Sequence, residues 1–469
     1  MPPTSANRFA DSHGREQDPR RGDNPLAHER LILSPTSLAG PGLHDPTVQT
    51  QRAKRDASPA APTRRIPMTS QVNDATALRH AMVTTLREEG LITSDSVAAA
   101  MRAVPRHDFA PGEPLEKVYR TDTTLVPKID AQGRQTSVVS ASHIQAIQLE
   151  QAEVRPGMNV LEIGSGGYNA ALIAEIVGPT GSVTTVDIDA DVVDRARAGL
   201  RRAGYEQVNV VLGDAEHGVA QYAPYDRIIV TVGSWDIPPA WLDQLTPDGR
   251  IVVPLRFAGI TRLIAFDRTP GSPALTAGNY RLGSFVPMQG DGAASEQMIP
   301  VTPDVGLRLD QNSTLTFDVP ALRKALHTKP VESWSGAPFD MPDELELYLL
   351  TRGPELPMLH AAQAAVEQGV VNRTVRNGTP ALVRGGSFAY RVKRENPQTV
   401  SGYETGVIAH GPEAEQVAGE LLAMICTWAD CYYRRGAAHI TYHPNTADTS
   451  GVTGWHTTKR HGALAVAWP

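Results

Sequence analysis

The chain has 469 residues, of which 41% are hydrophobic and 20% are charged, and its formal net charge at pH 7 is −7. This length allows roughly two or three domains with buried cores, and the acidic balance argues against nucleic acid, whose binding domains usually carry a basic excess. No apolar run reaches the ~20 residues of a membrane-spanning helix, and the first residues lack the apolar core of a secretory signal. We therefore expect a cytoplasmic protein that neither crosses nor binds a membrane.

In chain order, residues 1–67 are rich in proline and carry scattered charges without an apolar period, which predicts a disordered N-terminal extension. The pattern changes at Met68, where "MTSQVNDATALRHAMVTTLREEGLI" predicts an amphipathic helix with a cap near Asn73. Helical and strand patterns then alternate in "HIQAIQLEQA", "NVLEIG", "YNAALIAEIVG", "SVTTVDID", "DVVDRARAGLRRAG", "VNVVLGD", "YDRIIVTVG", "PPAWLDQLTPDG" and "RIVVPLR". This alternation predicts a parallel, doubly wound α/β sheet within a domain of residues 68–295.

Two further strands, "ITRLIAFDR" and "YRLGSFVPM", are expected at the far side of that sheet. The alternation is lost near residue 300, and a helix predicted over residues 413–435 has one apolar face. We predict that residues 296–469 form a separate C-terminal α+β domain, with peptide binding as its expected role.

The glycine turn in "LEIGSGGYNAALIAE" (161–175) suits three classes of ligand to different degrees. A nucleotide-binding P-loop would end in Gly-Lys-Ser/Thr, which is missing here. A dinucleotide fingerprint would have Gly or Ala where this chain has Asn169. Glu162, at the end of the strand before Gly164, instead suits a cationic ligand, and the glycines allow its close approach. The sulfonium and amino groups of S-adenosylmethionine meet that description.

Acidic residues also end the next two predicted strands. Asp187 is suited to accept hydrogen bonds from both hydroxyls of a ribose, and Asp214 would lie near an adenine amino group. Each acid could alternatively cap a helix, but all three at successive strand ends indicate a cofactor site. We predict a Rossmann-like class I S-adenosylmethionine-dependent methyltransferase whose cofactor-binding residues include Glu162, Gly164, Ser165, Gly166, Asp187, Asp214 and Ala215.

Several linked motifs follow in order: "MRAVPRHDFAP", "VSASHIQAIQLEQ", "GDAEHG", "APYDRIIVTVG", "IPPAWLDQL" and "FVPMQG". Over about residues 68–290 the chain resembles the protein-L-isoaspartate O-methyltransferase family. The resemblance implies methylation of a free carboxylate in a peptide, with Ser140 as the catalytic residue and His143 as a cofactor contact. The alternatives are a helix N-cap for Ser140 and an ordinary first-turn residue for His143.

The chain departs from the repair enzymes of that family in a glycine loop shorter by one residue, in bulky Trp235 with Asp236, and in its C-terminal extension. In these features it resembles the branch associated with ribosomally made peptides, namely lanthipeptide, graspetide and "FxLD system" enzymes. That resemblance implies methylation of an aspartate in a precursor peptide, linear or already cyclised, whose ester collapses to aspartimide or isoaspartate. Trp235 and Asp236 would then border the peptide pocket, or else form a capped helix start with a packed Trp.

The C-terminal sequence "TGWHTTKRHGALAVAWP" combines basic and aromatic residues, and we expect it either to grip an acidic peptide or to be a solvated cluster beside a core strand. His456 and His461 lack partners at a recognisable metal-ligand spacing, so no metal is assigned.

Three other functions stay open: repair of isoaspartyl proteins, methylation of a small molecule or RNA, and a peptide-binding scaffold without catalysis. The sequence gives no basis for an oligomeric state.

Overall fold

The computed structural model describes residues 68–131, 133–164, 166–339, 344–445, 447 and 452–469, so the predicted extension of residues 1–67 lies outside it. The N-terminal part begins with α1 (Met68–Glu88), α2 (Asp95–Ala103), η2 (Arg106–Phe109) and α3 (Leu115–Val118). A hairpin of β1 (Leu125–Ile129) and β2 (Gln135–Val139) follows, and then α4 (Ser142–Ala152) leads into the main sheet.

The main sheet is built from alternating strands and helices, as the sequence predicts. In chain order these are β3 (Asn159–Ile163), α5 (Tyr168–Val177), η3 (Gly178–Thr180), β4 (Ser182–Asp187), α6 (Ala190–Ala203), β5 (Asn209–Leu212), η4 (Ala215–His217), η5 (Ala220–Tyr222), β6 (Tyr225–Val230), α7 (Pro239–Asp243), β7 (Leu245–Phe257), β8 (Ile260–Arg268), β9 (Leu275–Leu282) and η6 (Gly290–Gly292). Strands β3 to β7 pair in parallel in the order β5-β4-β3-β6-β7, and β8 and β9 add antiparallel strands beyond β7. The predicted doubly wound α/β sheet is thereby confirmed.

The strand order reverses between β3 and β6, which is where doubly wound sheets bind ligands. The register puts Glu162 opposite Thr185 of β4 and opposite Ile229 of β6. Gly164 follows immediately after β3 ends. The glycine turn is therefore at the carboxyl edge of the sheet, beside the end of β6.

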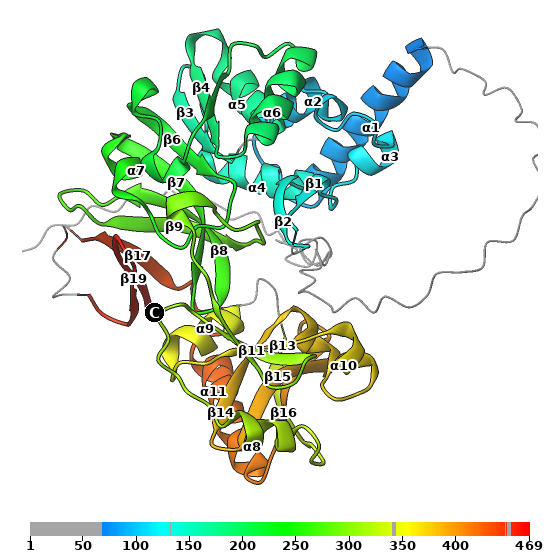
Figure 1. The fold of residues 1–469 in the computed structure, drawn as a ribbon, viewed down its shortest axis with the longest axis vertical. Coiled ribbons are helices and arrows are strands. Elements are labelled where there is room, and N and C mark those ends of the chain that lie inside the picture. Colours follow the sequence, from blue (N-terminus) through cyan, green and yellow to red (C-terminus); the bar gives the residue numbers. More distant parts are fainter. Residues whose placement is uncertain (1–67, 132, 165, 340–343, 446, 448–451) are drawn as a thin grey trace, which may run out of the picture.

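A second sheet forms the lower lobe in Figure 1. Its elements are β10 (Gln297–Pro300), β11 (Val305–Leu309), α8 (Val319–Ala325), β12 (Val331–Pro338), α9 (Glu344–Arg352), β13 (Met358–Ala361), α10 (Gln363–Glu367), η7 (Arg373–Asn377), β14 (Thr379–Arg384), β15 (Ser387–Glu395), β16 (Tyr403–His410) and α11 (Ala414–Cys431). Within the described residues its strands run in the order β10-β11-β13-β14-β15-β16-β12, and each neighbouring pair is antiparallel. This arrangement agrees with an α+β composition.

The end of the chain leaves the lower lobe and returns to the main sheet. The returning strands are β17 (His439–Pro444), β18 (Trp455–Thr458) and β19 (Gly462–Ala467), and β17 pairs with β9. Figure 1 shows β17 and β19 beside β9, well separated from β14 to β16. The structure therefore differs from the predicted unit of residues 296–469, because its last strands extend the methyltransferase sheet. The spacing of apolar residues along the sequence does not reveal which sheet a strand near the C-terminus joins.

One hydrophobic cluster connects the lobes. It contains Phe257 of β7 and Tyr442 of β17 together with Leu349 of α9 and Trp428 of α11. A shared apolar core of this kind opposes separation of the lobes, because opening it would expose that surface to water. None of the helices in the described part of the chain combines the length and apolar character that a membrane crossing requires.

Two predicted elements differ from the structure. The helix expected in "PPAWLDQLTPDG" ends at Asp243, and β7 already starts at Leu245. Pro247 interrupts helical hydrogen bonding, and Leu245 finds a strand partner in Tyr225. The strand expected in "YRLGSFVPM" ends at Leu282, after which the chain continues as a loop whose Val286 and Met288 form backbone hydrogen bonds with Gly233.

Candidate active site

A small cavity is located at the carboxyl ends of β3 and β6, under the glycine turn. Its lining residues are Val138, Val139, Ser140, Gln145, Gln148, Glu162, Gly164, Gly166, Tyr168, Asn169 and Thr231. Of the predicted cofactor residues, it brings together Glu162, Gly164 and Gly166, whereas Ser165 lies outside the described residues. The cavity therefore joins the end of β3 to the segment that precedes α4.

Glu162 is fully buried, and its Oε2 accepts a 2.5 Å hydrogen bond from the Thr185 hydroxyl. Its Oε1 is also buried and makes no hydrogen bond of ordinary geometry with any described residue, although Asn169 lies close by. Burial raises the pKa of Glu162 to about 7, and the hydrogen bond from Thr185 opposes that rise. A buried carboxylate oxygen with an unused acceptor site fits an ammonium or sulfonium ligand.

Gly164 and Gly166 of the turn each pack against a neighbouring segment of the chain. Gly164 has φ +92°, and a Cβ there would lie 2.5 Å from the Thr231 hydroxyl oxygen. That hydroxyl donates to the carbonyls of both Ile163 and Gly164, at 2.9 Å each. Gly166 packs against Val139, which a Cβ would meet at 3.5 Å. The turn is thus held directly against β6 and β2.

Asp187 and Asp214 are at the ends of β4 and β5, as expected, but both carboxylates also cap local backbone. Asp187 Oδ1 accepts from the N–H of Asp189 at 2.9 Å. Asp214 accepts through Oδ1 from Glu216 and through Oδ2 from Asp291, at 2.9 Å and 2.8 Å. Each oxygen can accept a further hydrogen bond, so their cofactor roles stay predictions.

Ala215, the last of the predicted cofactor residues, starts η4. Its carbonyl accepts a 2.7 Å hydrogen bond from the Trp241 indole N–H. This contact fixes the backbone next to Asp214, and a direct cofactor contact of Ala215 stays a prediction.

Ser140 is half-buried between β2 and α4, and its side chain lines the small cavity. The N-cap of α4 is Ala141, without a side-chain cap hydrogen bond, so the alternative role of Ser140 as that cap is not observed. The backbone carbonyl of Ser140 accepts a 2.8 Å hydrogen bond from Arg106 Nη2. Ser140 is therefore held through its main chain, and its hydroxyl is left to face the cavity.

His143 is buried in the first turn of α4, where its Nδ1 lies 2.9 Å from the Thr121 carbonyl. A carbonyl only accepts, so Nδ1 carries the hydrogen and Nε2 is the acceptor in the neutral ring. Burial lowers the pKa of His143, and the Thr121 contact opposes that effect. The imidazole is accordingly neutral at pH 7.

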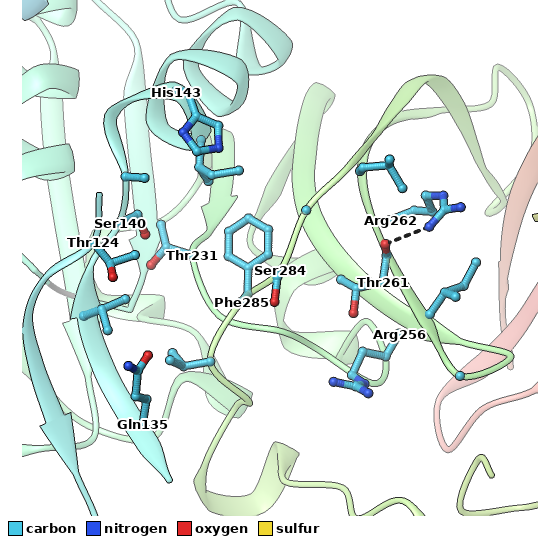
Figure 2. A pocket seen from close by; sticks show the side chains of 18 of the residues that line it. Thr124, Gln135, Ser140, His143, Thr231, Arg256, Thr261, Arg262, Ser284 and Phe285 are labelled. Carbon is cyan, nitrogen blue, oxygen red and sulfur yellow. Dashed lines mark hydrogen bonds between the residues drawn. The ribbon is translucent and has the colours of Figure 1, made fainter. Parts of the chain in front are cut away.

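A larger cleft of about 380 Å³ opens beside the small cavity, between the lobes. Figure 2 shows Ser140, Thr231 and His143 on one side of it and Arg256, Thr261 and Arg262 on the other. Ser284 and Phe285, from the loop after β9, project between the two sides. Arg308 of β11 and His360 of β13 also line the cleft, so the second sheet forms part of its wall.

Trp235 and Asp236 are not among the residues that line this cleft, so their expected place at a peptide pocket stays a prediction. Trp235 is buried, with the Lys459 ammonium 3.7 Å from its ring centroid. Asp236 Oδ1 accepts from the Tyr442 hydroxyl and the Ile237 N–H, and Oδ2 accepts from the His461 N–H. These side chains fasten the returning strands to the loop after β6.

The basic and aromatic strip predicted within residues 453–469 also helps to attach the returning strands to the main sheet. Lys459 is 3% exposed and donates a 2.7 Å hydrogen bond to the Arg256 carbonyl. His461 Nε2 lies 2.8 Å from Glu216, and Arg460 donates to the Asp291 carbonyl. Lys459 and His461 therefore pack against the main sheet, whereas His456 and Arg460 are exposed, and the lining of the cleft includes none of these four. Among the described residues, no three His, Cys, Asp or Glu side chains gather where they could bind a metal ion.

Sequence reasoning missed Arg106, which lies inside the quoted motif "MRAVPRHDFAP". Its side chain is fully buried and donates to the carbonyls of Val118 and Ser140 and to Gln145 Oε1, at 3.0, 2.8 and 2.7 Å. Thr231, Arg256 and Arg308 were also missed. The place of Arg106 inside a quoted family motif could have drawn attention to it, but nothing local distinguishes the other three.

Comparison with known proteins finds relatives of the part of the chain that contains the main sheet. The family model described as protein-L-isoaspartate(D-aspartate) O-methyltransferase matches residues 77–291. A protein-L-isoaspartate O-methyltransferase of Methanopyrus kandleri is 38% identical over 220 residues, which are 46% of this chain and 94% of that relative. A solved protein-L-isoaspartate O-methyltransferase shares 22% identity with a TM-score of 0.43, covering 77% of this chain and 96% of its own.

A second solved structure is a candidate protein-L-isoaspartate O-methyltransferase of Plasmodium falciparum in complex with S-adenosyl-L-homocysteine. It is 17% identical with a TM-score of 0.38, and the match covers 45% of this chain and 98% of that one. The relationship to the Methanopyrus protein extends over nearly all of that relative's length. The chain therefore belongs to the protein-L-isoaspartate O-methyltransferase family of S-adenosylmethionine-dependent carboxyl O-methyltransferases.

Proposed function

We propose that this protein transfers a methyl group from S-adenosylmethionine to the side-chain carboxylate of an isoaspartyl residue in a peptide or protein. The observation that carries the proposal is that Ser140 and Thr231 line both the small cavity of Glu162 and the larger cleft. Methyl transfer requires donor and acceptor to meet at one point in a fixed geometry. A cofactor cavity and a peptide cleft that join at Ser140 supply such a point.

The acceptor needs no general base in this reaction. A side-chain carboxyl with a pKa of about 4 is already ionised at neutral pH. The protein must instead orient one carboxylate oxygen and remove water from it. The Ser140 hydroxyl can donate a hydrogen bond to the second carboxylate oxygen, and the neutral His143 adds no competing charge beside it.

The buried acceptor at Glu162 fits the amino group of the methionine part of the cofactor. When bound, S-adenosylmethionine supplies a methyl group on a cationic sulfonium. Glu162 Oε1 would hold the ammonium, while Asp187 and Asp214 would take the ribose hydroxyls and the adenine amino group. Gly164 and Gly166 leave room for the cofactor beside the turn.

The test is methylation of a pair of peptides that differ only in carrying isoaspartate or aspartate at one position. Mass spectrometry after incubation with S-adenosylmethionine is expected to find a gain of one methylene on the isoaspartyl peptide. Ser140→Ala is expected to reduce this gain strongly, and the matched control Ser96→Ala, on the exposed face of α2, is expected to leave it unchanged. Absence of any methylated product with wild-type protein would contradict the proposal.

A second candidate is methylation of an ordinary aspartate in a ribosomally made precursor peptide. It is favoured by the wall that β11 and β13 add to the cleft, since a repair enzyme must admit many protein surfaces. In that case residues 296–469 would contribute recognition of the precursor. The backbone nitrogen after the aspartate would attack the ester and expel methanol, which forms aspartimide.

The test of this candidate uses aspartyl peptides encoded by short reading frames, if any lie next to the gene. Methylation of their aspartyl peptides, followed by a species one water lighter than the starting peptide, would support it. A return to the starting mass would indicate isoaspartate. Modification of the isoaspartyl peptide alone would leave repair as the function.

A further inference from the structure

An arginine pair lies across the cleft from Ser140, and its two members come from different sheets. Arg256 belongs to β7 and Arg308 to β11, and both line the cleft. Figure 2 shows Arg256 on the side of the cleft opposite Ser140 and His143. Glu296 joins the two arginines, accepting from Arg256 Nη2 and, at 2.9–3.0 Å, from Arg308 Nη1. The side chains of Arg256 and Arg308 are 20% and 15% exposed, so they are partly shielded from water.

This cluster carries more positive than negative charge. Two guanidinium groups share the carboxylate of Glu296. His360 accepts a 2.9 Å hydrogen bond from Arg308 Nε and is neutral, because burial and both arginines lower its pKa to about 3. Behind Arg256, the ammonium of Lys459 is offset by Asp310, which accepts from two backbone N–H groups.

The other charged groups that line the cleft have partners. Arg262 pairs with Glu346 at 3.2 Å, and Asp122 pairs with Arg120 at 3.0 Å. The local excess at Arg256 and Arg308 is therefore not cancelled by these neighbours.

The two arginines differ in how many of their donors the protein uses. Arg308 is fixed by hydrogen bonds to His360, Glu296 and the Gly259 carbonyl. Arg256 makes a side-chain hydrogen bond only through Nη2 to Glu296, counted over the residues that the structure describes. Nη2 carries two hydrogens, and Glu296 accepts only one of them. The other Nη2 hydrogen, together with that of Nε or Nη1 on the same edge of the guanidinium, forms a fork that can bind a carboxylate with two hydrogen bonds.

We propose that Arg256, supported by Arg308, binds a second carboxylate of the peptide substrate, distinct from the one that is methylated at Ser140. This inference rests on the proposed function. The second carboxylate belongs either to an acidic side chain near the target residue or to the C-terminus of the peptide. Arg308, Glu296 and His360 lie beyond the family match at residues 77–291, so this selectivity would be an addition by the C-terminal region.

Direct binding of labelled peptides tests the proposal independently of catalysis. All peptides contain one isoaspartyl residue in neutral surroundings and an amidated C-terminus, and fluorescence anisotropy is measured with S-adenosylhomocysteine present. One variant peptide replaces a neighbouring glutamine by glutamate, and another has a free C-terminal carboxylate. We expect one of these two to bind about tenfold to a hundredfold more tightly than the neutral peptide, which also identifies the source of the carboxylate.

Protein variants locate the effect at the cleft. Arg256→Gln is expected to abolish the preference for the acidic peptide, because it should weaken binding of the acidic peptide far more than binding of the neutral one. Arg256→Lys keeps the charge but loses the fork, and it should retain only part of the preference. Arg352→Gln, on an exposed position of α9, is the matched control and should behave as wild type.

Equal affinity of wild-type protein for acidic and neutral peptides, or an equal loss for both in Arg256→Gln, would overturn the inference. Methylation without charge preference would overturn this inference but leave the proposed function intact. Selective binding of acidic peptides without methylation of any of them would support this inference and contradict the proposed function.

Discussion

Arg106 Nη2 donates a 2.8 Å hydrogen bond to the backbone carbonyl of Ser140, 34 residues further along the chain. The same guanidinium is fully buried and lies 4.9 Å from the ring centroid of Tyr168, in the first turn of α5. Arg106 thus ties the strand end that carries Ser140 to the helix that follows the glycine turn. It is a positioning residue, because its own side chain lines neither cavity.

Replacing Arg106 by lysine should therefore reduce catalysis through geometry. A lysine cannot reproduce the fork that reaches Val118, Gln145 and Ser140 together. We expect kcat to fall about tenfold to a hundredfold, because small displacements of a positioning group have effects of that size. KM for S-adenosylmethionine should change little, and methylation assays below the unfolding temperature measure both. A variant that loses thermal stability but keeps wild-type kcat would show that the role is structural only.

Ser140→Ala separates the catalytic role of this residue from a capping role. Loss of an N-cap serine typically costs about 1 kcal/mol of stability, but Ala141 is the cap of α4. We expect an unchanged midpoint of thermal unfolding, unchanged affinity for S-adenosylhomocysteine, and kcat lower by about tenfold or more. Calorimetric titration and thermal unfolding are the measurements. A lower unfolding midpoint with normal kcat would return Ser140 to the helix-cap role.

Glu162 makes cofactor affinity depend on pH. Its pKa is raised to about 7 by burial, so near pH 7 about half of the ligand-free molecules carry a neutral carboxyl. A cationic amino group binds the ionised form, and affinity for S-adenosylhomocysteine should rise from about pH 6 to pH 8, by up to about tenfold per pH unit on the acidic side, and then level off. Titration calorimetry across that range measures the dependence.

The same shift has the opposite effect on folding. The folded chain holds this proton more tightly than the unfolded chain, so the contribution of Glu162 to stability falls as pH rises from its ordinary value of 4.5 to about 7. Glu162→Gln, which still accepts from Thr185, is the control and should flatten both dependences while weakening cofactor binding. An unchanged pH profile in that variant would contradict the assignment of the titrating group.

The contact between Tyr442 and Asp236 should matter for stability and not for substrate binding. The Tyr442 hydroxyl donates at 2.6 Å to a carboxylate that is 8% exposed, and the proximity of Asp236 adds to burial in raising the pKa of that hydroxyl. Tyr442→Phe should lower the free energy of unfolding by about 1–3 kcal/mol, the range for hydrogen bonds to charged groups. Chemical denaturation measures this loss. An increased peptide KM at unchanged stability would instead support the prediction that Asp236 contacts the substrate.

Much of the sheet could be predicted from local patterns. The apolar runs ending at Ile163, Asp187 and Val230 are buried strands, and apolar period and turn residues are properties of a few consecutive positions. Glu162 could be predicted as a cofactor residue for the same reason, since an acid next to a glycine turn is a local signal. The contacts of Tyr442 and His461 with Asp236 could not be predicted in this way. These partners are 206 and 225 residues apart in the sequence, so no local pattern links them.

The sequence by itself therefore determined the α/β class and the predicted cofactor edge of the sheet, which follow from alternating strands and helices and from the chemistry of neighbouring residues. The candidate Ser140 came from the resemblance of its motif to the family. Only the tertiary structure decided that Trp235 and Asp236 fasten the C-terminal strands, and that Arg256 and Arg308 face Ser140's cleft from two sheets. The physical reason is that distant segments pack together only where their apolar faces are buried and their buried charges find partners. No short stretch of sequence specifies that combination.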